Sequence, residues 1–235
     1  MSILAEHFHR IRAELVKGMP GLQVQLRDDY EKHYINVAFP KNEPHWIHCS
    51  FAIDPYDSSL LVIRDFTITN APDEVFTRCG VASLLMEKLC TIAQTMELRG
   101  MRLATNRYGA RVWPLGGFLP SEEDWQYIVK PDQRHKALVL SCKTEEEEHE
   151  RQRILSEYLN PQSGPAALVS IARSALADRL LPHGSYHLRM FFDQAINTHH
   201  FGTFTHLTDE KRAAITQKMQ AYLQRHGLGG TVQNI

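Results

Sequence analysis

The chain has 235 residues, and its 26 basic and 27 acidic side chains leave a formal net charge of −1. This balance excludes a generally basic nucleic-acid-binding protein and a polyacidic disordered chain, while 43% hydrophobic and 23% charged residues are typical of a globular protein. Because a domain usually holds about 100–150 residues, the length allows one large domain or one domain with an extension.

The cysteines and the apolar runs bear on the cellular compartment. The cysteines are widely spaced and include no C-x-x-C pair: Cys49, Cys79, Cys90 and Cys142. This spacing predicts reduced thiols, as in a cytoplasmic protein. No run approaches the roughly 20 apolar residues of a membrane span, and residues 1–15 lack the apolar core of a signal peptide. We therefore expect cytoplasmic localisation and no membrane partner.

The first hundred residues predict a helix and then a sheet. Apolar residues recur on one helical face over 4–16, and Gly18 and Pro20 end that pattern. Four β-like runs follow, joined by short links rich in turn residues: 22–26, 34–39, 46–53 and 60–68. Short links join antiparallel strands, so these runs predict a meander.

A crossover unit comes next. The period becomes helical over 81–98, Gly100 ends the run, and 101–105 is a short apolar strand. Strand, helix and strand in this order predict that 60–68 and 101–105 run parallel. A short helix is expected at 110–115 and a further strand at 137–142 (ALVLSC). The expected fold class is therefore α/β, with a mixed sheet.

The last third of the chain reads as a helical extension. Thr144 precedes four glutamates, which predicts an N-cap with Glu147 placed for a capping box. Helices are expected at 145–159, 166–181 and 209–225, the last between Thr208 as N-cap and Gly227. The apolar segment 186–197 fits a helix or a strand equally. We place the domain boundary between 1–142 and 143–235.

The turn before the helix at 81–98 has small residues that suit an anion. Gly80, Ala82 and Ser83 open this helix, and the free N–H groups of a helix start can bind a phosphate or pyrophosphate. Arg78 would add a guanidinium to such a site. The same pattern also occurs where a helix merely packs on a strand. A second motif is therefore needed before a phosphate site is inferred.

A second motif follows the strand at 101–105, and together the two resemble those of the GCN5-related N-acetyltransferase superfamily. In that family a Q/R-x-x-G-x-G/A turn opens the helix after strand four, and an N-x-x-A-x-x-x-Y-x-x-x-G-F-like segment follows strand five. This chain supplies Gly80 and Ala82 for the first motif, and Asn106, Ala110, Gly117 and Phe118 for the second. The resemblance covers roughly 1–142, and its motif-specific part is 76–118.

The resemblance implies an acyl-CoA-dependent N-acyltransferase, with acetyl-CoA or another acyl-CoA as co-substrate and no metal. Backbone groups of 66–68 would pair with the pantetheine arm, and the start of the next helix would hold the pyrophosphate. Asp65 would be the general base that deprotonates the attacking amine. The implied acyl-CoA-binding residues are Phe66, Ile68, Arg78, Gly80, Val81, Ala82, Ser83, Asn106, Ala110 and Trp113.

Two departures from the family pattern motivate an alternative. The arginine expected three residues before Gly80 is Thr77, and Trp113 occupies the position of the tyrosine that often protonates the leaving thiolate. Indole cannot donate that proton, so Tyr108 is the candidate acid. The alternative is a catalytically inactive binding or adaptor module whose helical extension docks a partner.

Several other clusters suggest ligands. His45 and His48 would point to opposite faces of a strand and so cannot share a metal, but His48 is a second candidate base. His199, His200 and His206 lack accompanying metal ligands. The cations Arg99, Arg102, Arg107 and Arg111 form either a solvated rim or a site for the 3′-phosphate of coenzyme A.

The partners are only partly constrained. The attacked amine belongs to a protein or a small molecule, and the near-neutral charge with sparse stacking aromatics does not favour nucleic acid. The helices of 143–235 fit a protein partner or a dimer contact.

Overall fold

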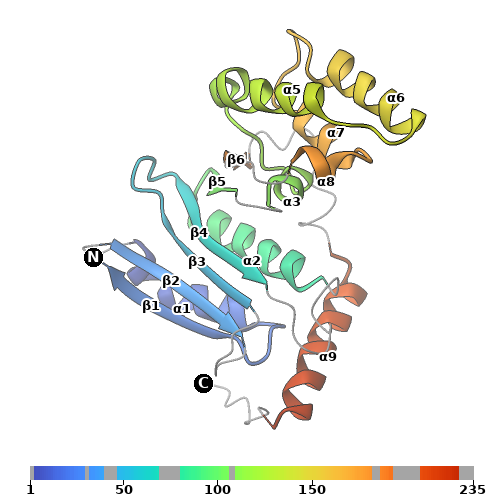
Figure 1. The fold of residues 1–235 in the computed structure, drawn as a ribbon. Helices are drawn as coiled ribbons and strands as arrows, with labels where there is room; N and C mark the ends of the chain where they lie inside the picture. Colours follow the sequence, from blue (N-terminus) through green and yellow to red (C-terminus); the bar gives the residue numbers. More distant parts are fainter. Residues whose placement is uncertain are drawn as a thin grey trace. The chain divides into compact units, whose positions relative to one another are not determined.

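The computed structural model describes residues 3–29, 32–39, 47–68, 80–105, 109–181, 186–192 and 207–227. The chain divides into two compact units, Met1–Met101 with Phe204–Ile235, and Arg102–Thr203 (Figure 1). This division differs from the predicted boundary at 142/143. Residues 102–142 belong to the second unit, and the helix at 209–225 belongs to the first.

The fold is α/β with a mixed sheet of six strands in the order β1-β2-β3-β4-β5-β6, which confirms the predicted fold class. The strands are β1 Gln23–Asp29, β2 Lys32–Phe39, β3 Ile47–Ile53, β4 Leu60–Ile68, β5 Gly100–Ala104 and β6 His187–Phe191. The first four strands form the predicted antiparallel meander, and the sheet contains one parallel pair.

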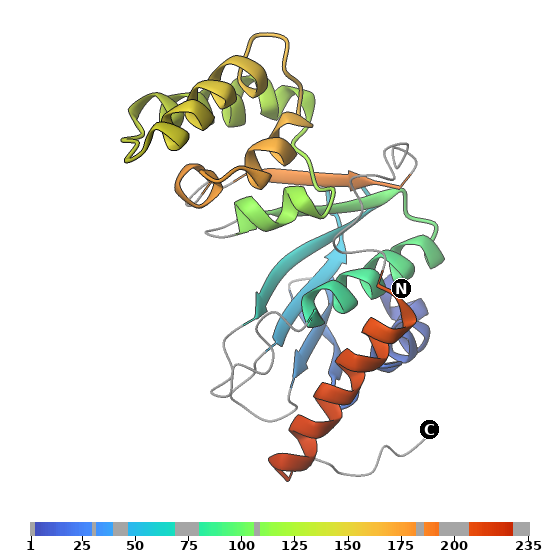
Figure 2. The ribbon, with the colours of Figure 1, turned by 90° about the vertical axis from the view of Figure 1, so that its right-hand side faces the viewer.

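In the first unit, the helices α1 (Ile3–Val16) and α2 (Val81–Thr95) lie on one side of the meander (Figure 2). Alternate side chains of β2 and β3 supply the apolar face that they cover. These side chains are fully buried: Ile35, Val37, Phe39, Ile47, Cys49 and Phe51. Lys88 of α2 and Glu14 of α1 form an ion pair of 3.0 Å beside this core. The polar side chains that alternate with them along the same strands point to the opposite face of the sheet.

Helix α9 (Asp209–Arg225) completes the first unit although it follows the second unit in the sequence. Its apolar face is buried through Ile215, Met219, Tyr222 and Leu223. Thr208 caps the helix as predicted, since its hydroxyl accepts a hydrogen bond from the N–H of Lys211. Arg212 binds Glu87 of α2 at 2.7 Å, and the rings of Tyr222 and Phe39 are 5.8 Å apart. α9 is thus anchored to both α2 and β2.

The second unit is mostly helical. Its helices are α3 Gly109–Leu115, α4 Glu122–Asp124, α5 Lys130–Val139, α6 Glu145–Arg153, α7 Ala167–Arg173 and α8 Ala177–Leu180, with π-helical turns at Trp125–Val129 and Ile154–Tyr158. The π turn at Trp125–Val129 lies just before Pro131. Since proline lacks an N–H and its ring crowds the preceding turn, a wider turn accommodates it within the helix.

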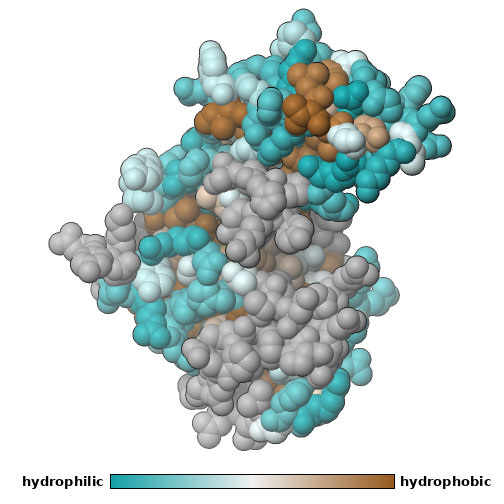
Figure 3. Space-filling model, viewed as in Figure 1, coloured by the Kyte–Doolittle hydropathy of each residue, from teal (hydrophilic) through white to brown (hydrophobic). Residues whose placement is uncertain are grey.

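The strand predicted at 137–142 is wrong, because residues 137–139 are the end of α5. Ala137 is buried, whereas Leu138 and Val139 are 56% and 66% exposed, so this apolar run does not form a buried strand. Figure 3 shows hydrophobic side chains at the surface over α5. A short apolar run does not distinguish a helix from a strand by its pattern alone.

The other elements of this unit follow the expected pattern with one interruption. Thr144 caps α6 by accepting the N–H of Glu147, and α6 continues into the π turn Ile154–Tyr158. The helix predicted at 166–181 is divided into α7 and α8. Ser174, which follows α7, has an extended backbone, so the helix ends there. The ambiguous segment contains β6, whose Arg189 pairs with Leu119 through backbone hydrogen bonds of 2.7 and 2.9 Å.

Within the described part of the chain, no helix is long and apolar enough to cross a membrane.

The docking of α9 can be tested at a glycine. Gly21 has φ +76°, and a Cβ there would lie 2.8 Å from Leu223 Cδ1 and 3.1 Å from Phe39 Cε2. Gly227 has φ +64° but nothing within 4 Å, so it is a matched control. We expect Gly21→Ala to lower the free energy of unfolding by about 2–4 kcal/mol, and Gly227→Ala by only the about 1–2 kcal/mol of the left-handed backbone. Urea unfolding measures both, and equal losses would contradict the close packing.

Candidate functional site

The candidate site is a polar pocket of about 350 Å³ on the face of the meander opposite the core. Neighbouring side chains of β2, β3 and β4 line it: Tyr34, Asn36, His48, Ser50, Arg64 and Asp65. Asn36 is paired with Ser50, and Ser50 with Asp65, so three of these residues form a row across the strands. Figure 3 shows hydrophilic side chains over much of this part of the first unit.

A β-bulge in β4 brings two adjacent side chains into this pocket. Ser50 pairs with Asp65, but the next residue, Phe51, pairs with Ile63, so Arg64 is an extra residue in β4. In a regular strand, the neighbours Arg64 and Asp65 would point to opposite faces. A bulge interrupts this alternation and redirects side chains. Arg64 and Asp65 consequently line the same pocket, next to the buried Ile63.

His48 and Asp65 form a hydrogen-bonded pair within the pocket. His48 Nδ1 lies 2.6 Å from Asp65 Oδ2, and the hydroxyl of Thr67 donates to Asp65 Oδ1 at 3.1 Å. A carboxylate only accepts hydrogen bonds, so Nδ1 carries the proton and Nε2 of the neutral ring is an acceptor. The side chains are 36% and 45% exposed, so a ligand can reach them. The pair has the arrangement of a general base held in place by a carboxylate.

The remaining pocket residues place an acceptor and a cation beside this pair. Among the described residues, Asn36 Oδ1 is buried and has no hydrogen-bond partner. The guanidinium carbon of Arg64 lies 5.0 Å from the centre of the Tyr34 ring, which is a cation–π contact. A buried acceptor without a partner is costly to the fold.

The structure places part of the predicted acyl-CoA site at the start of α2. Gly80 precedes this helix with φ +88°, and Val81, Ala82 and Ser83 form its first turn. The first bond of the helix runs from the N–H of Leu84 to the carbonyl of Gly80 at 3.0 Å. A Cβ at Gly80 would lie 3.0 Å from Ile215 Cδ1, so α9 packs close to this turn. Phe66 is half-buried on β4 and Ile68 ends that strand.

Other predicted residues lie elsewhere. Arg78, Asn106 and Tyr108 are outside the described residues, as is Thr77. Ala110 and Trp113 lie on α3 in the second unit, where Ala110 is fully buried and Trp113 is 8% exposed. The indole of Trp113 packs edge-on against Phe118, with ring centres 5.5 Å apart. The roles predicted for all these residues therefore stay predictions.

The predicted cationic stretch is divided between the units and partly neutralised. Arg99 binds Asp57 at 3.1 Å in the first unit, and Arg111 binds Asp178 in the second. Hydrogen bonds from Ser59, followed by the charge of Arg99, lower the pKa of Asp57. Arg107 is outside the described residues. These ion pairs fit the rim interpretation, while the 3′-phosphate interpretation stays a prediction.

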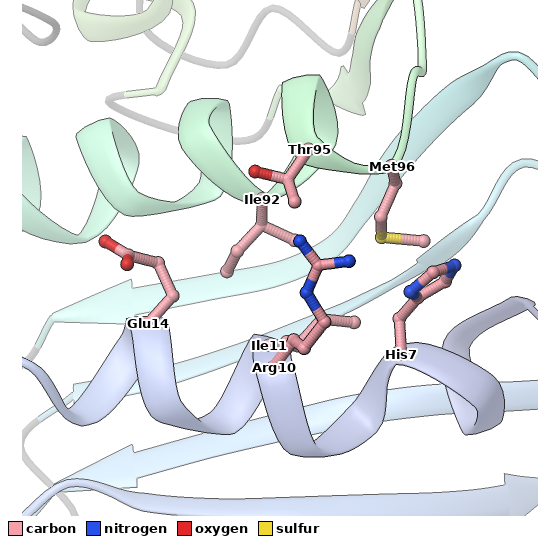
Figure 4. A pocket seen from close by; sticks show the side chains of 7 residues that line it. All are labelled: His7, Arg10, Ile11, Glu14, Ile92, Thr95 and Met96. Carbon is pink, nitrogen blue, oxygen red and sulfur yellow. The ribbon is translucent and has the colours of Figure 1, made fainter.

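A smaller cavity of about 180 Å³ lies between α1 and α2 (Figure 4). Its lining combines polar and apolar side chains: His7, Arg10, Ile11, Glu14, Ile92, Thr95 and Met96. Glu14 is already paired with Lys88, and the hydroxyl of Thr95 donates to the carbonyl of Thr91. This cavity lies beside the helices that cover the core, away from the His48–Asp65 pair.

The sequence pointed to Asp65 and His48 separately but not to their neighbours. Alternation along β2 and β3 was a usable signal, because it puts Tyr34 and Asn36 on one face of β2 and His48 and Ser50 on the matching face of β3. Regular alternation from the buried Ile63 also puts Arg64 on this face, whereas only the bulge brings Asp65 to it.

Comparison with known proteins gives no match, whether against models of protein families, curated proteins or solved structures. Among the described residues, no three His, Cys, Asp or Glu side chains are grouped so that they could hold a metal ion.

The described cysteines should differ in reactivity. Burial raises the pKa of Cys49 far above its usual value and that of Cys90 to about 12, while partial desolvation and then Glu148 raise the pKa of the half-buried Cys142. Because only the thiolate reacts, iodoacetamide should modify Cys142 slowly at pH 7.5 and faster as the pH rises beyond 9. Cys49 and Cys90 should react only after unfolding. Peptide mass spectrometry gives the rates, and modification of Cys49 in the folded protein would contradict its burial.

Proposed function

We propose that this protein transfers an acyl group from acyl-CoA to an amine, and that His48, held by Asp65, is the general base. The observation that carries the proposal is the 2.6 Å contact between His48 Nδ1 and Asp65 Oδ2 in a pocket on β3 and β4. The role first predicted for Asp65 changes accordingly. Its carboxylate faces the imidazole, so Asp65 orients the base, and His48 Nε2 accepts the proton.

The proposed reaction removes two protons from the substrate ammonium group, and the His48–Asp65 pair would accept the second of them. The ammonium form of the substrate first loses one proton to solvent. The neutral amine nitrogen then attacks the thioester carbon, and a C–N bond forms as the C–S bond breaks. His48 Nε2 takes the second proton from the nitrogen and returns it to the leaving thiolate, which yields the amide and free coenzyme A. A positioned base of this kind typically contributes about 10²–10⁴-fold to the rate.

The start of α2 supports the acyl-CoA part of the proposal. The first N–H groups of a helix have no acceptor within it and carry the positive end of the helix dipole. In α2 these groups belong to Val81, Ala82 and Ser83, whose small side chains allow close approach. The resemblance of 76–118 to the N-acetyltransferase turn adds the expectation that a pyrophosphate binds here. Phe66 and Ile68, at the end of β4, would then lie along the pantetheine arm.

The catalytic part is tested by comparing two His–Asp pairs. His33 and Asp28 form a similar contact in the β1–β2 hairpin but do not line the pocket, so His33→Gln is a matched control. His48→Gln should lower kcat/KM for acyl transfer by about 10²–10⁴-fold, and Asp65→Asn should lower it less, because the base remains but loses its orientation. Release of coenzyme A measures the rates. Equal effects of His48→Gln and His33→Gln would exclude His48 as the base.

The acyl-CoA site is tested by a charge at the start of α2. Ser83→Glu adds a carboxylate where the helix dipole favours one, so the fold should be kept or slightly stabilised. The same charge would repel a pyrophosphate, and we expect binding of coenzyme A to weaken by about tenfold or more. Ser83→Gln, of the same size but uncharged, is the control. Calorimetry measures the affinities, and equal affinity for the two variants would place the pyrophosphate elsewhere.

A second candidate function is a catalytically inactive module of the same fold. The packing of Trp113 favours it, because a tryptophan buried against Phe118 in α3 cannot supply the proton expected from a tyrosine at this position. In that case coenzyme A would bind without transfer to any amine. The helices of 143–235 would then contact a protein partner or a second copy.

A further inference from the structure

One helical segment of the second unit is apolar on two opposite sides. α4, the π turn Trp125–Val129 and α5 follow one another without a break over 122–139. The inward row of this segment recurs at every fourth residue and is buried: Trp125, Val129, Gln133 and Ala137. Positions two residues further on lie about 200° around a helix, and thus on its other side. These positions are all exposed: Tyr127, Pro131, His135 and Val139.

The exposed side, which we call the outer face, is unusually hydrophobic. It comprises the exposed row together with the neighbouring Ile128 and Leu138. Among the described residues, seven large hydrophobic side chains are exposed, and four of them lie on this face with 53–79% of their surface accessible: Tyr127, Ile128, Leu138 and Val139. Figure 3 shows such side chains at the surface of this unit. A helix normally presents polar residues to water opposite its buried side, so the composition of the outer face indicates an interface.

We propose that a second copy of this chain covers the outer face, in a two-fold dimer whose 122–139 segments run antiparallel. The apolar positions are symmetric about the middle of the segment, since Tyr127 and Val139 are equally far from it, as are Ile128 and Leu138. In an antiparallel pair, Tyr127 of each copy therefore meets Val139 of the other, and Ile128 meets Leu138. A two-fold interface requires this self-complementarity. The dimer is independent of the proposed acyl transfer.

The charges of the segment select the antiparallel direction. Its first turn is acidic, with Glu122, Glu123 and Asp124, while Lys136 lies in the last turn and the exposed Lys143 follows the end of the helix. An antiparallel pair places the acidic start of each copy beside the basic end of the other, and it also opposes the two helix dipoles. A parallel pair would instead bring the two acidic starts together. Complementary charges around an apolar centre orient association in this way.

The composition of the outer face also fits the anatomy of a protein interface. Specific interfaces cover about 800 Å² on each partner, with an apolar centre enriched in aromatic residues and a polar rim. Tyr127 supplies an exposed aromatic ring, and Glu123 and Lys143 lie beyond the two ends of the apolar row. The face therefore has a centre and a rim, both provided by residues of the second unit.

The dimer is tested by sedimentation of the full chain over about 1–100 µM, the range in which weak dimers form and dissociate. The wild-type protein should reach the mass of two chains at the upper end. Val139→Glu should weaken association by tenfold or more, because it puts a carboxylate into the apolar centre next to the acidic start of the other copy.

The matched control is Val16→Glu. Val16 is likewise an exposed valine at the last position of a helix, α1, so the carboxylate meets the same unfavourable end of a helix dipole. Val16→Glu should leave the dimer unchanged, and circular dichroism should show that both variants are folded. A wild-type chain that stays monomeric throughout would overturn the inference, as would equal association of the two variants.

The antiparallel direction is tested on the wild-type protein with a carbodiimide, which joins a carboxylate directly to a lysine. Glu123 and Lys143 of one chain lie at opposite ends of a segment that spans roughly 27 Å, so a link between them has to join two copies. Mass spectrometry of a mixture of ¹⁴N- and ¹⁵N-labelled chains should show this link with both labels. A dimer without any link from Glu122, Glu123 or Asp124 to Lys136 or Lys143 of the other chain would contradict the antiparallel pairing.

Discussion

Burial of one face of the β1–β4 meander against α1 and α2 is the constraint on which the rest of the first unit depends. Successive side chains of a strand point to opposite faces of the sheet. Burial of Ile35, Val37 and Phe51 in the core therefore places the residues that alternate with them on the opposite face. A shift of register by one residue would bury the polar pocket side chains and expose the core. The apolar packing on one face of these strands therefore determines which side chains line the pocket on the other face.

Two local departures from regular structure occur together in this pocket. The bulge at Arg64 interrupts the pairing of β3 with β4, and Asn36 keeps a buried oxygen without a partner among the described residues. Each departure destabilises a sheet when taken alone. Natural sequences tend to carry such inconsistencies at functional sites. Their coincidence beside the His48–Asp65 pair is what separates this pocket from the cavity between α1 and α2, where Glu14 is already paired.

The sequence was sufficient to predict most helices and strands but insufficient to predict how the pocket residues come together, and this difference has a physical reason. Strong periodicity located the helices α1, α2 and α9 and the four strands of the meander, because their apolar faces are formed by residues close in the chain. Strict alternation from the buried Ile63 would put Asp65 on the core face, and only the bulge reverses this. The helix that replaced the strand at 137–142, and the packing of α9 on the first unit, depend on contacts between distant segments. No local pattern encodes such contacts.

The chain order of the two units has a consequence for how this protein is made. The first unit needs α9, whose Tyr222 packs against Phe39 and whose Arg212 binds Glu87, yet α9 is synthesised after the whole of the second unit. During translation, part of the apolar surface of the meander with α1 and α2 stays uncovered while residues 102–203 emerge and fold, because α9 is synthesised only afterwards. The polar pocket can form early, but its scaffold is closed late. A ribosome stalled before residue 209 would display an almost complete site on an unfinished support.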